Sequence, residues 1–178
     1  LFRSGLASVH KWTLKWRLPV NAPKTEIICF SKTGHKEVNI KMDNNALKQV
    51  KEKRILDVVL DENLNFKSHI QQTATRARSA LGKICVFTKE SRGASMKIMC
   101  MLYKTCVRPL MEYAYTVWSP NDNIEPLVKV QNMALTKATG AMQHSSTSAL
   151  EVITGILPLD IRLKEVLLRS EEHTSELQ

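Results

Sequence analysis

Apolar residues recur at two different periods along this chain. Within residues 6–16 they return every three or four positions, which predicts an amphipathic helix that ends before Pro19. Between residues 25 and 60 the apolar runs are shorter and partly alternate with polar residues, as in strands. The expected strands are 25–30 and 37–42, joined as a β-hairpin, and a second pair at 47–50 and 54–60. These strands predict a small antiparallel sheet.

From Asp61 onward the period becomes that of helices. Asn63 or Asn65 can cap a long helix over about 65–87, whose apolar stripe is Ile70, Ala74, Ala77, Leu81 and Ile84. Further helical patterns cover 94–115, which Pro109 kinks or divides, 124–139, 147–154 and 158–168. The predicted fold class is therefore α+β, with the small antiparallel sheet followed by a mainly α-helical bundle.

The composition adds bounds to this picture. The chain has 178 residues, 43% hydrophobic and 24% charged, which suits one globular domain or two small ones. No apolar run approaches the roughly 18 residues of a membrane span, and no charged-then-apolar leader opens the sequence. We therefore expect neither a secreted nor a membrane protein.

Charge is distributed unevenly along the sequence. Residues 1–110 hold 21 basic and 8 acidic residues, whereas residues 111–178 hold 5 basic and 9 acidic ones, which together give the net charge of +9. A strongly basic segment suits a polyanionic partner. The alternative is a lysine-rich surface that is merely solvated.

Metal and nucleophile chemistry find little support in the pattern. The four cysteines form no CxxC pair, so buried reduced thiols are expected and structural zinc is not. Asp57 and Asp61 on one strand would lie about 13 Å apart, too far to share an ion, so we expect no metal site. His69 is expected on a helix surface. The aromatic cluster near Pro109 is expected to be core, with base stacking as the alternative; it comprises Tyr103, Tyr113, Tyr115 and Trp118.

Several motifs in fixed order carry a family resemblance. They are Asn21-Ala22-Pro23-Lys24-Thr25-Glu26 ending at Phe30, then 55–61, Leu64, Phe66, His69 and Ile70, Leu102 and Tyr103, Arg108-Pro109, Tyr113, Trp118, Gln131-Asn132, Ala134-Leu135, Gly140, and Gly155 with 157–159. Over residues 1–168 the chain resembles the reverse transcriptases of non-LTR (LINE-type) retrotransposons, most closely the jockey-like elements. The resemblance implies a palm end at 1–62 and a helical thumb at 63–168, parts of an RNA-directed DNA polymerase.

The resemblance also implies roles for individual residues. Lys24 matches the motif-D lysine, a supporting catalytic group near the leaving pyrophosphate; otherwise it simply opens a strand. Ile55, Leu56 and Val58 match the strand that grips the primer end, where Ile55 replaces an aromatic residue and Asp57 a glycine. Arg76, Arg78 and Lys83 would face template–primer phosphates on the long helix, unless that face is only solvated.

The implied partners are an RNA template, an RNA–DNA hybrid duplex and the upstream palm and fingers of the same polypeptide, inside the cell. The family's Mg²⁺ is held by palm aspartates expected upstream of Leu1, so this segment alone is expected to bind no metal and to be inactive. The alternatives are a stand-alone basic nucleic-acid-binding module and a decayed transposon copy without function.

The final ten residues are set apart from this pattern. Residues 169–178 resemble, letter for letter, the translation of a common sequencing adapter. We therefore exclude them from the expected fold.

Overall fold

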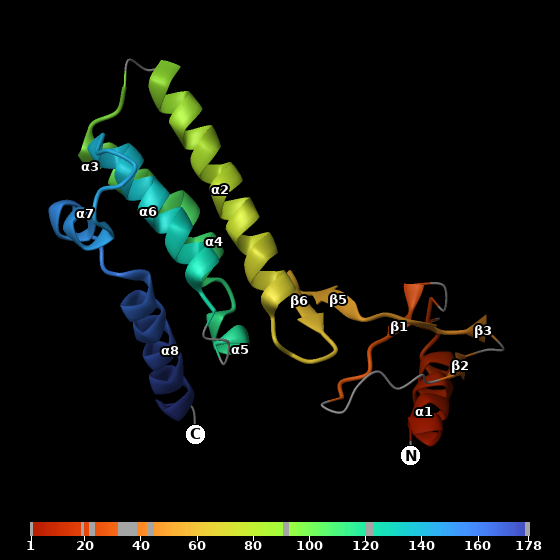
Figure 1. Cartoon of the computed structure of the whole chain (residues 1–178). Coiled ribbons are helices and arrows are strands. Elements are labelled where there is room, and N and C mark those ends of the chain that lie inside the picture. Colours follow the sequence, from red (N-terminus) through yellow and green to blue (C-terminus); the bar gives the residue numbers. More distant parts are fainter. Residues whose placement is uncertain are drawn as a thin grey trace. The chain divides into compact units, whose positions relative to one another are not determined.

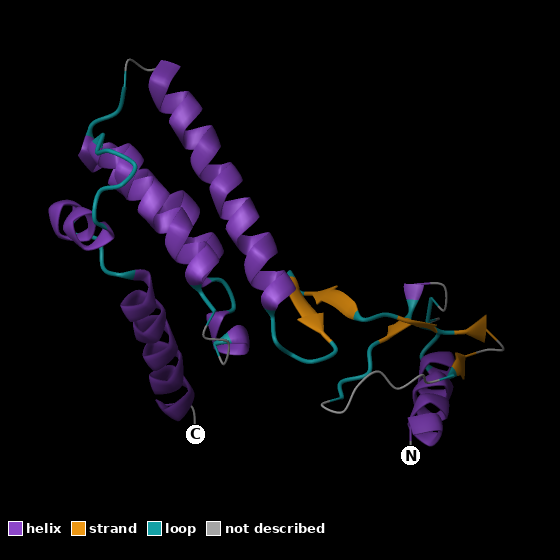
Figure 2. Ribbon diagram, viewed as in Figure 1, coloured by secondary structure: helices purple, strands orange, loops and turns teal. Residues whose placement is uncertain are grey.

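The computed structural model describes residues 2–18, 20–21, 24–31, 39–42, 45–90, 93–119 and 123–176. The chain divides into two compact units, 1–64 and 65–178. Short paired strands and one long helix form the first unit, and helices form the second (Figure 1). Figure 2 shows the same division by element type. The predicted α+β class is confirmed.

The first unit begins with helix α1 (Phe2–Lys15), which confirms the helix predicted over 6–16. Thr13 is buried, but the neighbouring indoles of Trp12 and Trp16 remain 55% and 59% exposed. Their ring centroids lie 6.3 Å apart. Much of the apolar surface of α1 therefore stays open to solvent.

Three two-stranded pairs follow α1. Strand β1 (Glu26–Ile27) pairs in parallel with β4 (Lys48–Gln49), and β2 (Lys41–Met42) pairs antiparallel with β3 (Asn45–Ala46). The expected hairpin between 25–30 and 37–42 is therefore wrong for the described residues; 32–38 lie outside them. Burial explains the difference, because pairing β1 with β4 brings Ile27 against the buried Ile40 and Leu47.

The third pair is a tight hairpin. β5 (Glu52–Ile55) and β6 (Val58–Asp61) pair from Glu52 opposite Asp61 to Ile55 opposite Val58. The two residues between them, Leu56 and Asp57, have φ of 46° and 65°. Two positive φ angles define a type I′ turn, whose twist matches that of paired strands. The expected pairing of 47–50 with 54–60 is therefore wrong, because the chain reverses at Leu56.

Helices make up the second unit. They are α2 (Lys67–Glu90), α3 (Met96–Leu102), the π-helix η2 (Tyr103–Val107), α4 (Arg108–Glu112), α5 (Tyr115–Trp118), α6 (Glu125–Thr139), α7 (Thr147–Thr154) and α8 (Leu159–Glu176). Helix α6 packs against α2, α3, α7 and α8 (Figure 1). The α2 backbone starts where expected, since the amide of Lys67 donates to Asn65 Oδ1 at 3.0 Å. Gly140 and Gly155 end α6 and α7 in the left-handed region.

The interruption expected near Pro109 takes the form of a π-helical turn. η2 ends two residues before Pro109, and α4 carries the proline in its first turn. Proline has no amide hydrogen and its ring collides with the carbonyl four residues earlier. A change of hydrogen-bond register just before it accommodates both effects.

The core of the second unit is formed by side chains from almost every helix. The predicted stripe is buried at Ile70, Ala74, Ala77 and Leu81, while Ile84 is half-buried. The other buried apolar residues here are Phe66, Met99, Cys100, Tyr103, Val107, Met111, Trp118, Leu127, Val130, Ala134, Leu135, Leu150, Ile156, Leu159 and Leu163. Fully burying one such aliphatic or aromatic side chain stabilises a fold by about 1.5–3 kcal/mol.

Helix α8 is longer than expected. The pattern predicted a helix over 158–168, but α8 continues to Glu176 and includes most of the segment excluded above. No glycine or proline interrupts 159–176, and Glu, Leu and Arg are good helix formers. Local propensity therefore extends this helix beyond its apolar pattern.

Candidate nucleic-acid interface

Lys24 lies in a turn that Asn21 shapes. The amide of Lys24 donates to the backbone oxygen of Asn21 at 3.0 Å and to Asn21 Oδ1 at 3.1 Å. The hydroxyl of Thr25 donates to the same backbone oxygen at 2.9 Å. An asparagine that accepts from downstream groups in this way stabilises a turn. The result is an exposed Lys24 two residues before the start of β1.

An ion pair crosses from β1 to β5. Lys53 Nζ donates to Glu26 Oε2 at 2.6 Å. This hydrogen bond is the main reason that the pKa of the Glu26 carboxyl is lowered. The hydrogen-bond partner of Glu26 is therefore Lys53 on β5.

The predicted primer-gripping residues all lie at the tip of the hairpin, where Ile55 pairs with Val58, but they differ in exposure. Ile55 is half-exposed, Leu56 is 85% exposed, and Val58 is buried. Asp57 does not lie within a strand as expected; it forms the turn with Leu56, where Arg54 Nη1 approaches Asp57 Oδ1 at 3.4 Å. The strand separation assumed for Asp57 and Asp61 therefore does not apply. The hairpin presents two apolar side chains at its tip.

The three cations of α2 that were predicted to contact nucleic acid do not share one face. At about 100° per residue, Lys83 follows Arg76 by two turns on the same flank, whereas Arg78 is rotated by about 200°. Arg78 and Lys83 are exposed, and Arg76 is half-buried. Helix α2 therefore carries positive charge on two flanks of its buried stripe. Contact of these residues with nucleic acid remains a prediction.

His69 is the clearest correction among the polar residues. It was expected on a helix surface, but it is only 1% exposed and its ring lies 5.9 Å from that of Trp118. Tyr115 meets the other side of the cluster edge-on, with its ring 4.7 Å from Trp118. The Trp118 indole donates to the backbone oxygen of Tyr113 at 2.9 Å. Core packing is thus confirmed for Tyr103 and Trp118, which are buried, while Tyr113 is half-exposed.

A buried polar network joins the resemblance motifs of the second unit. The Tyr103 hydroxyl donates to Gln131 Oε1 at 2.7 Å, and Gln131 Nε2 donates to Glu151 Oε1 at 3.0 Å and to the backbone oxygen of Leu157 at 3.1 Å. Burial raises the pKa of the Tyr103 hydroxyl, which keeps its proton in place. Gln131 therefore ties η2, α6, α7 and the turn before α8 together.

An arginine cluster fastens α8 to α4. Arg162 donates through Nε and Nη2 to the two carboxylate oxygens of Glu112 at 2.7 and 3.2 Å, and through Nη1 to Glu165 at 2.9 Å. The hydrogen bond from Arg162 is also the main cause of the lowered pKa of Glu165. Arg162 is thus occupied within the fold and offers little charge to a ligand.

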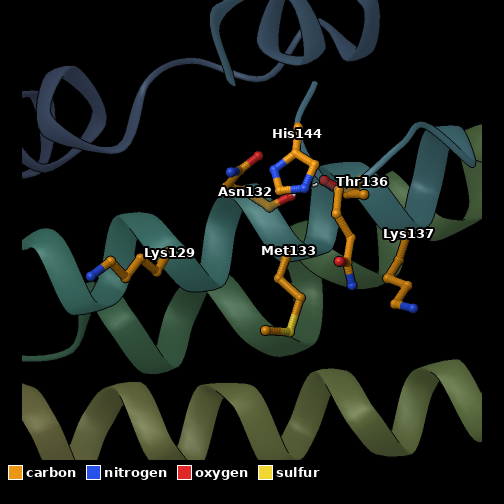
Figure 3. A pocket seen from close by; sticks show the side chains of 7 residues that line it. Lys129, Asn132, Met133, Thr136, Lys137 and His144 are labelled. Atoms are coloured by element: carbon orange, nitrogen blue, oxygen red, sulfur yellow. Dashed lines mark hydrogen bonds between the residues drawn. The ribbon is translucent and has the colours of Figure 1, made fainter. Parts of the chain in front are cut away.

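Sequence reasoning missed a hollow on the outer side of α6. Its volume is about 350 Å³, and its lining includes Lys129, Met133 and Lys137, which recur every four residues along α6, together with His144 after the helix. Figure 3 shows the two lysines at opposite ends, with Met133 between them. The four-residue spacing is visible in the sequence, but the approach of His144 depends on how the chain leaves Gly140.

Among the described residues, no three His, Cys, Asp or Glu side chains gather closely enough to hold a metal ion. The described helices include none with the length and hydropathy of a membrane span.

Comparisons with known proteins give consistent relatives. The chain is 22% identical over 169 residues to the RNA-directed DNA polymerase from mobile element jockey of Drosophila funebris, covering 94% of the chain and 18% of that protein. It is 25% identical over 170 residues to the Pol polyprotein of the type-1 retrotransposable element R1 of Bradysia coprophila, covering 91% and 17%. It is 23% identical over 174 residues to the probable RNA-directed DNA polymerase from transposon BS of Drosophila melanogaster, covering 96% and 18%.

The similarity confirms the resemblance to the polymerases of non-LTR retrotransposons. The chain spans less than a fifth of the length of these three relatives. No protein-family model and no solved structure matches the chain.

Proposed function

We propose that this chain is the end of the palm, residues 1–62, and the thumb, residues 63–168, of a non-LTR retrotransposon reverse transcriptase, and that it holds the template–primer duplex. The observation that carries this proposal is the similarity to polymerases of jockey, R1 and BS elements, which extends over 91–96% of the chain and thus through both units. The strongly basic first 110 residues suit a partner rich in phosphate.

The duplex would be held by α2 and by the β5–β6 hairpin. Arg78 and Lys83 lie exposed on the two flanks of α2, with Arg76 half-buried beside Lys83. Such cations position a duplex through its phosphates without reading its sequence. The exposed Ile55 and Leu56 at the hairpin tip would contact the primer end, and the buried Val58 would support the hairpin.

The upstream part of the same polypeptide would cover α1. Val9 and Trp12 lie on one stripe of this helix, Trp16 follows Trp12 by one turn directly after the helix, and each is more than half exposed. Such a stripe is typical of an apolar surface that another segment of protein buries. The relatives are long enough to supply that segment, since the chain matches only 17–18% of their length.

Nucleotide transfer itself would depend on aspartates and Mg²⁺ held elsewhere in the polypeptide. Within this chain, the exposed Lys24 would neutralise charge on the leaving pyrophosphate. We therefore expect no primer extension by this chain alone at millimolar Mg²⁺. Incorporation of labelled nucleotide by the purified chain would contradict this expectation.

Binding to a blunt 20-base-pair RNA–DNA hybrid, followed by fluorescence anisotropy in dilute salt, tests the proposal directly. The double variant Arg78→Ala/Lys83→Ala should weaken binding at least tenfold. The matched variant Lys97→Ala/Lys164→Ala removes two exposed lysines from α3 and α8 and should change binding less than twofold. Equal losses in both variants would show that α2 has no special role.

The stand-alone binding module is favoured by one observation, the separate core of the second unit. The genomic context separates the two proposals. An upstream reading frame that encodes an Asp-Asp turn supports the polymerase, and a start codon directly before Leu1 supports the module. The replacement of a glycine by Asp57 gives little support to the alternative of a decayed copy, because aspartate tolerates the left-handed turn position that it occupies.

A further inference from the structure

The hollow on α6 concentrates positive charge in an otherwise acidic segment. Residues 111–178 hold only five basic residues against nine acidic ones, and two of the five, Lys129 and Lys137, line this hollow. Two of the other three basic residues are paired with carboxylates: Arg162 with Glu112 and Glu165, and Arg169 with Glu165. None of the described residues that line the hollow carries a carboxylate. The charge therefore favours an anionic ligand.

The lysines can both reach such a ligand. They are eight residues apart on α6, or about 12 Å along the helix axis. Lys129 also contacts Glu125 at 2.7 Å, but both side chains are about two-thirds exposed or more, at 66% and 70%. An exposed pair of this kind is worth at most about 1 kcal/mol. Lys129 can therefore exchange Glu125 for a phosphate at little cost.

The floor and wall of the hollow suit an aromatic ring with a polar edge. Met133 supplies a partly exposed thioether between the lysines, a group that packs well on aromatic faces. Thr136 Oγ1 donates its proton to the backbone oxygen of Asn132 at 2.9 Å and so retains lone pairs for a donor. Asn132 also lines the hollow, but its Oδ1 atom is itself buried, so the hydroxyl of Thr136 supplies the acceptor for an amino group.

We propose that this hollow binds one unpaired nucleotide, with the phosphates on Lys129 and Lys137 and an amino-bearing base over Met133 beside Thr136 and Asn132. A nucleotide combines the anionic group, the flat ring and the polar edge that the lining calls for, and a volume of about 350 Å³ lies in the range of small-ligand sites. The site is separate from the α2 surface and goes beyond duplex binding.

The chain offers a direct reporter of this site. Of its seven methionines, Met133 lies in the hollow, while Met96 and Met101 are exposed on α3. In the full chain labelled with ¹³C at the methionine methyl groups, titration with the single-stranded octanucleotide rA8 should shift the Met133 signal and leave those of Met96 and Met101 in place. A Met133→Leu variant assigns the signal. An unmoved Met133 signal overturns the proposal.

Two ligand arms identify the source of the nucleotide. If adenosine monophosphate shifts the Met133 signal as rA8 does, the nucleotide alone is sufficient for binding. If rA8 shifts the signal and adenosine monophosphate does not, the site takes a nucleotide within a strand. Both outcomes support the proposal. An octaglutamate peptide provides the competing chemistry. If it shifts Met133 and binds as tightly as rA8, the hollow recognises acidic peptides and the proposal is wrong.

Variants separate this site from the duplex surface. Lys129→Ala/Lys137→Ala should weaken rA8 binding at least tenfold and the blunt hybrid less than twofold, with Lys97→Ala/Lys164→Ala as the control for nonspecific charge loss. Arg78→Ala/Lys83→Ala should weaken binding of the blunt hybrid at least tenfold and binding of rA8 less than twofold. If the α6 variant loses rA8 affinity as expected but the α2 variant keeps its affinity for the hybrid, only the proposed duplex surface is contradicted. Equal loss of rA8 affinity in the α6 and control variants would overturn the nucleotide site.

Discussion

The two units of this chain bury their apolar residues to very different extents. In the second unit, Trp118, Leu127 and Leu163 are inaccessible to solvent and the polar Gln131 has partners for both ends of its amide. Among the described residues of the first unit, the buried apolar ones are Ile40 and Leu47, with Val20 and Ile27 packed beside them, and Val58 and Val59 of the hairpin. Trp12 of α1 and Trp16 directly after it are exposed. The difference indicates that the second unit supplies most of its own stability, whereas the first depends more on what packs against it.

The largest expected effect compares one tryptophan from each unit. Trp118→Ala should lower the free energy of unfolding by about 3–5 kcal/mol, because it leaves a cavity in a packed core. Trp16→Ala, at an exposed site that touches Trp12, should cost no more than about 1 kcal/mol. Urea unfolding followed by circular dichroism at 222 nm measures both. Similar losses in the two variants would contradict the comparison.

A second prediction concerns the buried network of the helical unit. Tyr103→Phe removes the donor to Gln131 Oε1 and should cost about 1–3 kcal/mol, since a buried acceptor then has no partner. Tyr113→Phe, at a half-exposed ring, is the matched control and should change stability by about 0.5 kcal/mol or less. The same urea titration measures the free energy of unfolding of both variants. A Tyr103→Phe variant as stable as the unaltered chain would show that the network adds little.

Charged pairs sharpen the comparison between buried and exposed positions. Glu112→Gln leaves Arg162 and Arg108 without their shared carboxylate, and we expect a loss of about 1–2 kcal/mol because this cluster is largely shielded from water. Glu125→Gln breaks an exposed pair with Lys129 and should cost about 0.5 kcal/mol or less. Thermal unfolding at low and high salt tests both. The two variants behaving alike would argue that burial does not strengthen the Glu112 cluster.

The smallest effect is expected in the first unit. Asp57→Gly should stabilise the β5–β6 hairpin by up to about 1 kcal/mol, because glycine adopts the left-handed turn position without strain. Loss of the exposed contact with Arg54 offsets part of this gain. Slower hydrogen exchange of the amides at 52–61 would confirm the prediction. Faster exchange would mean that the ion pair matters more than the backbone conformation.

The helices could largely be predicted from the sequence, and the strand pairing could not. Helix signals are local: the apolar stripe of α2, Asn65 before it and Gly140 after α6 each act within a few residues. The partner of β1 depends instead on which pairing buries Ile27, a contact between distant residues.

The site residues show the same limit. Hydropathy alone places His69 and Gln131 on the surface, although both are buried among residues from other helices. The arrangement of Arg76, Arg78 and Lys83 on two flanks follows from helical geometry, so it could have been worked out from their spacing. The hollow beside Met133 could not, because it forms where the chain after α6 returns toward the helix.

The salt dependence of binding to the RNA–DNA hybrid tests the central claim most directly. If Arg78 and Lys83 each contact a phosphate, the Arg78→Ala/Lys83→Ala variant should show a log–log salt slope shallower by about 1.8 than that of the unaltered chain, using the value of about 0.9 per phosphate for B-form duplex. The Lys97→Ala/Lys164→Ala variant should keep the original slope. An unchanged slope in the α2 variant, or no affinity for the hybrid even in dilute salt, would contradict the account.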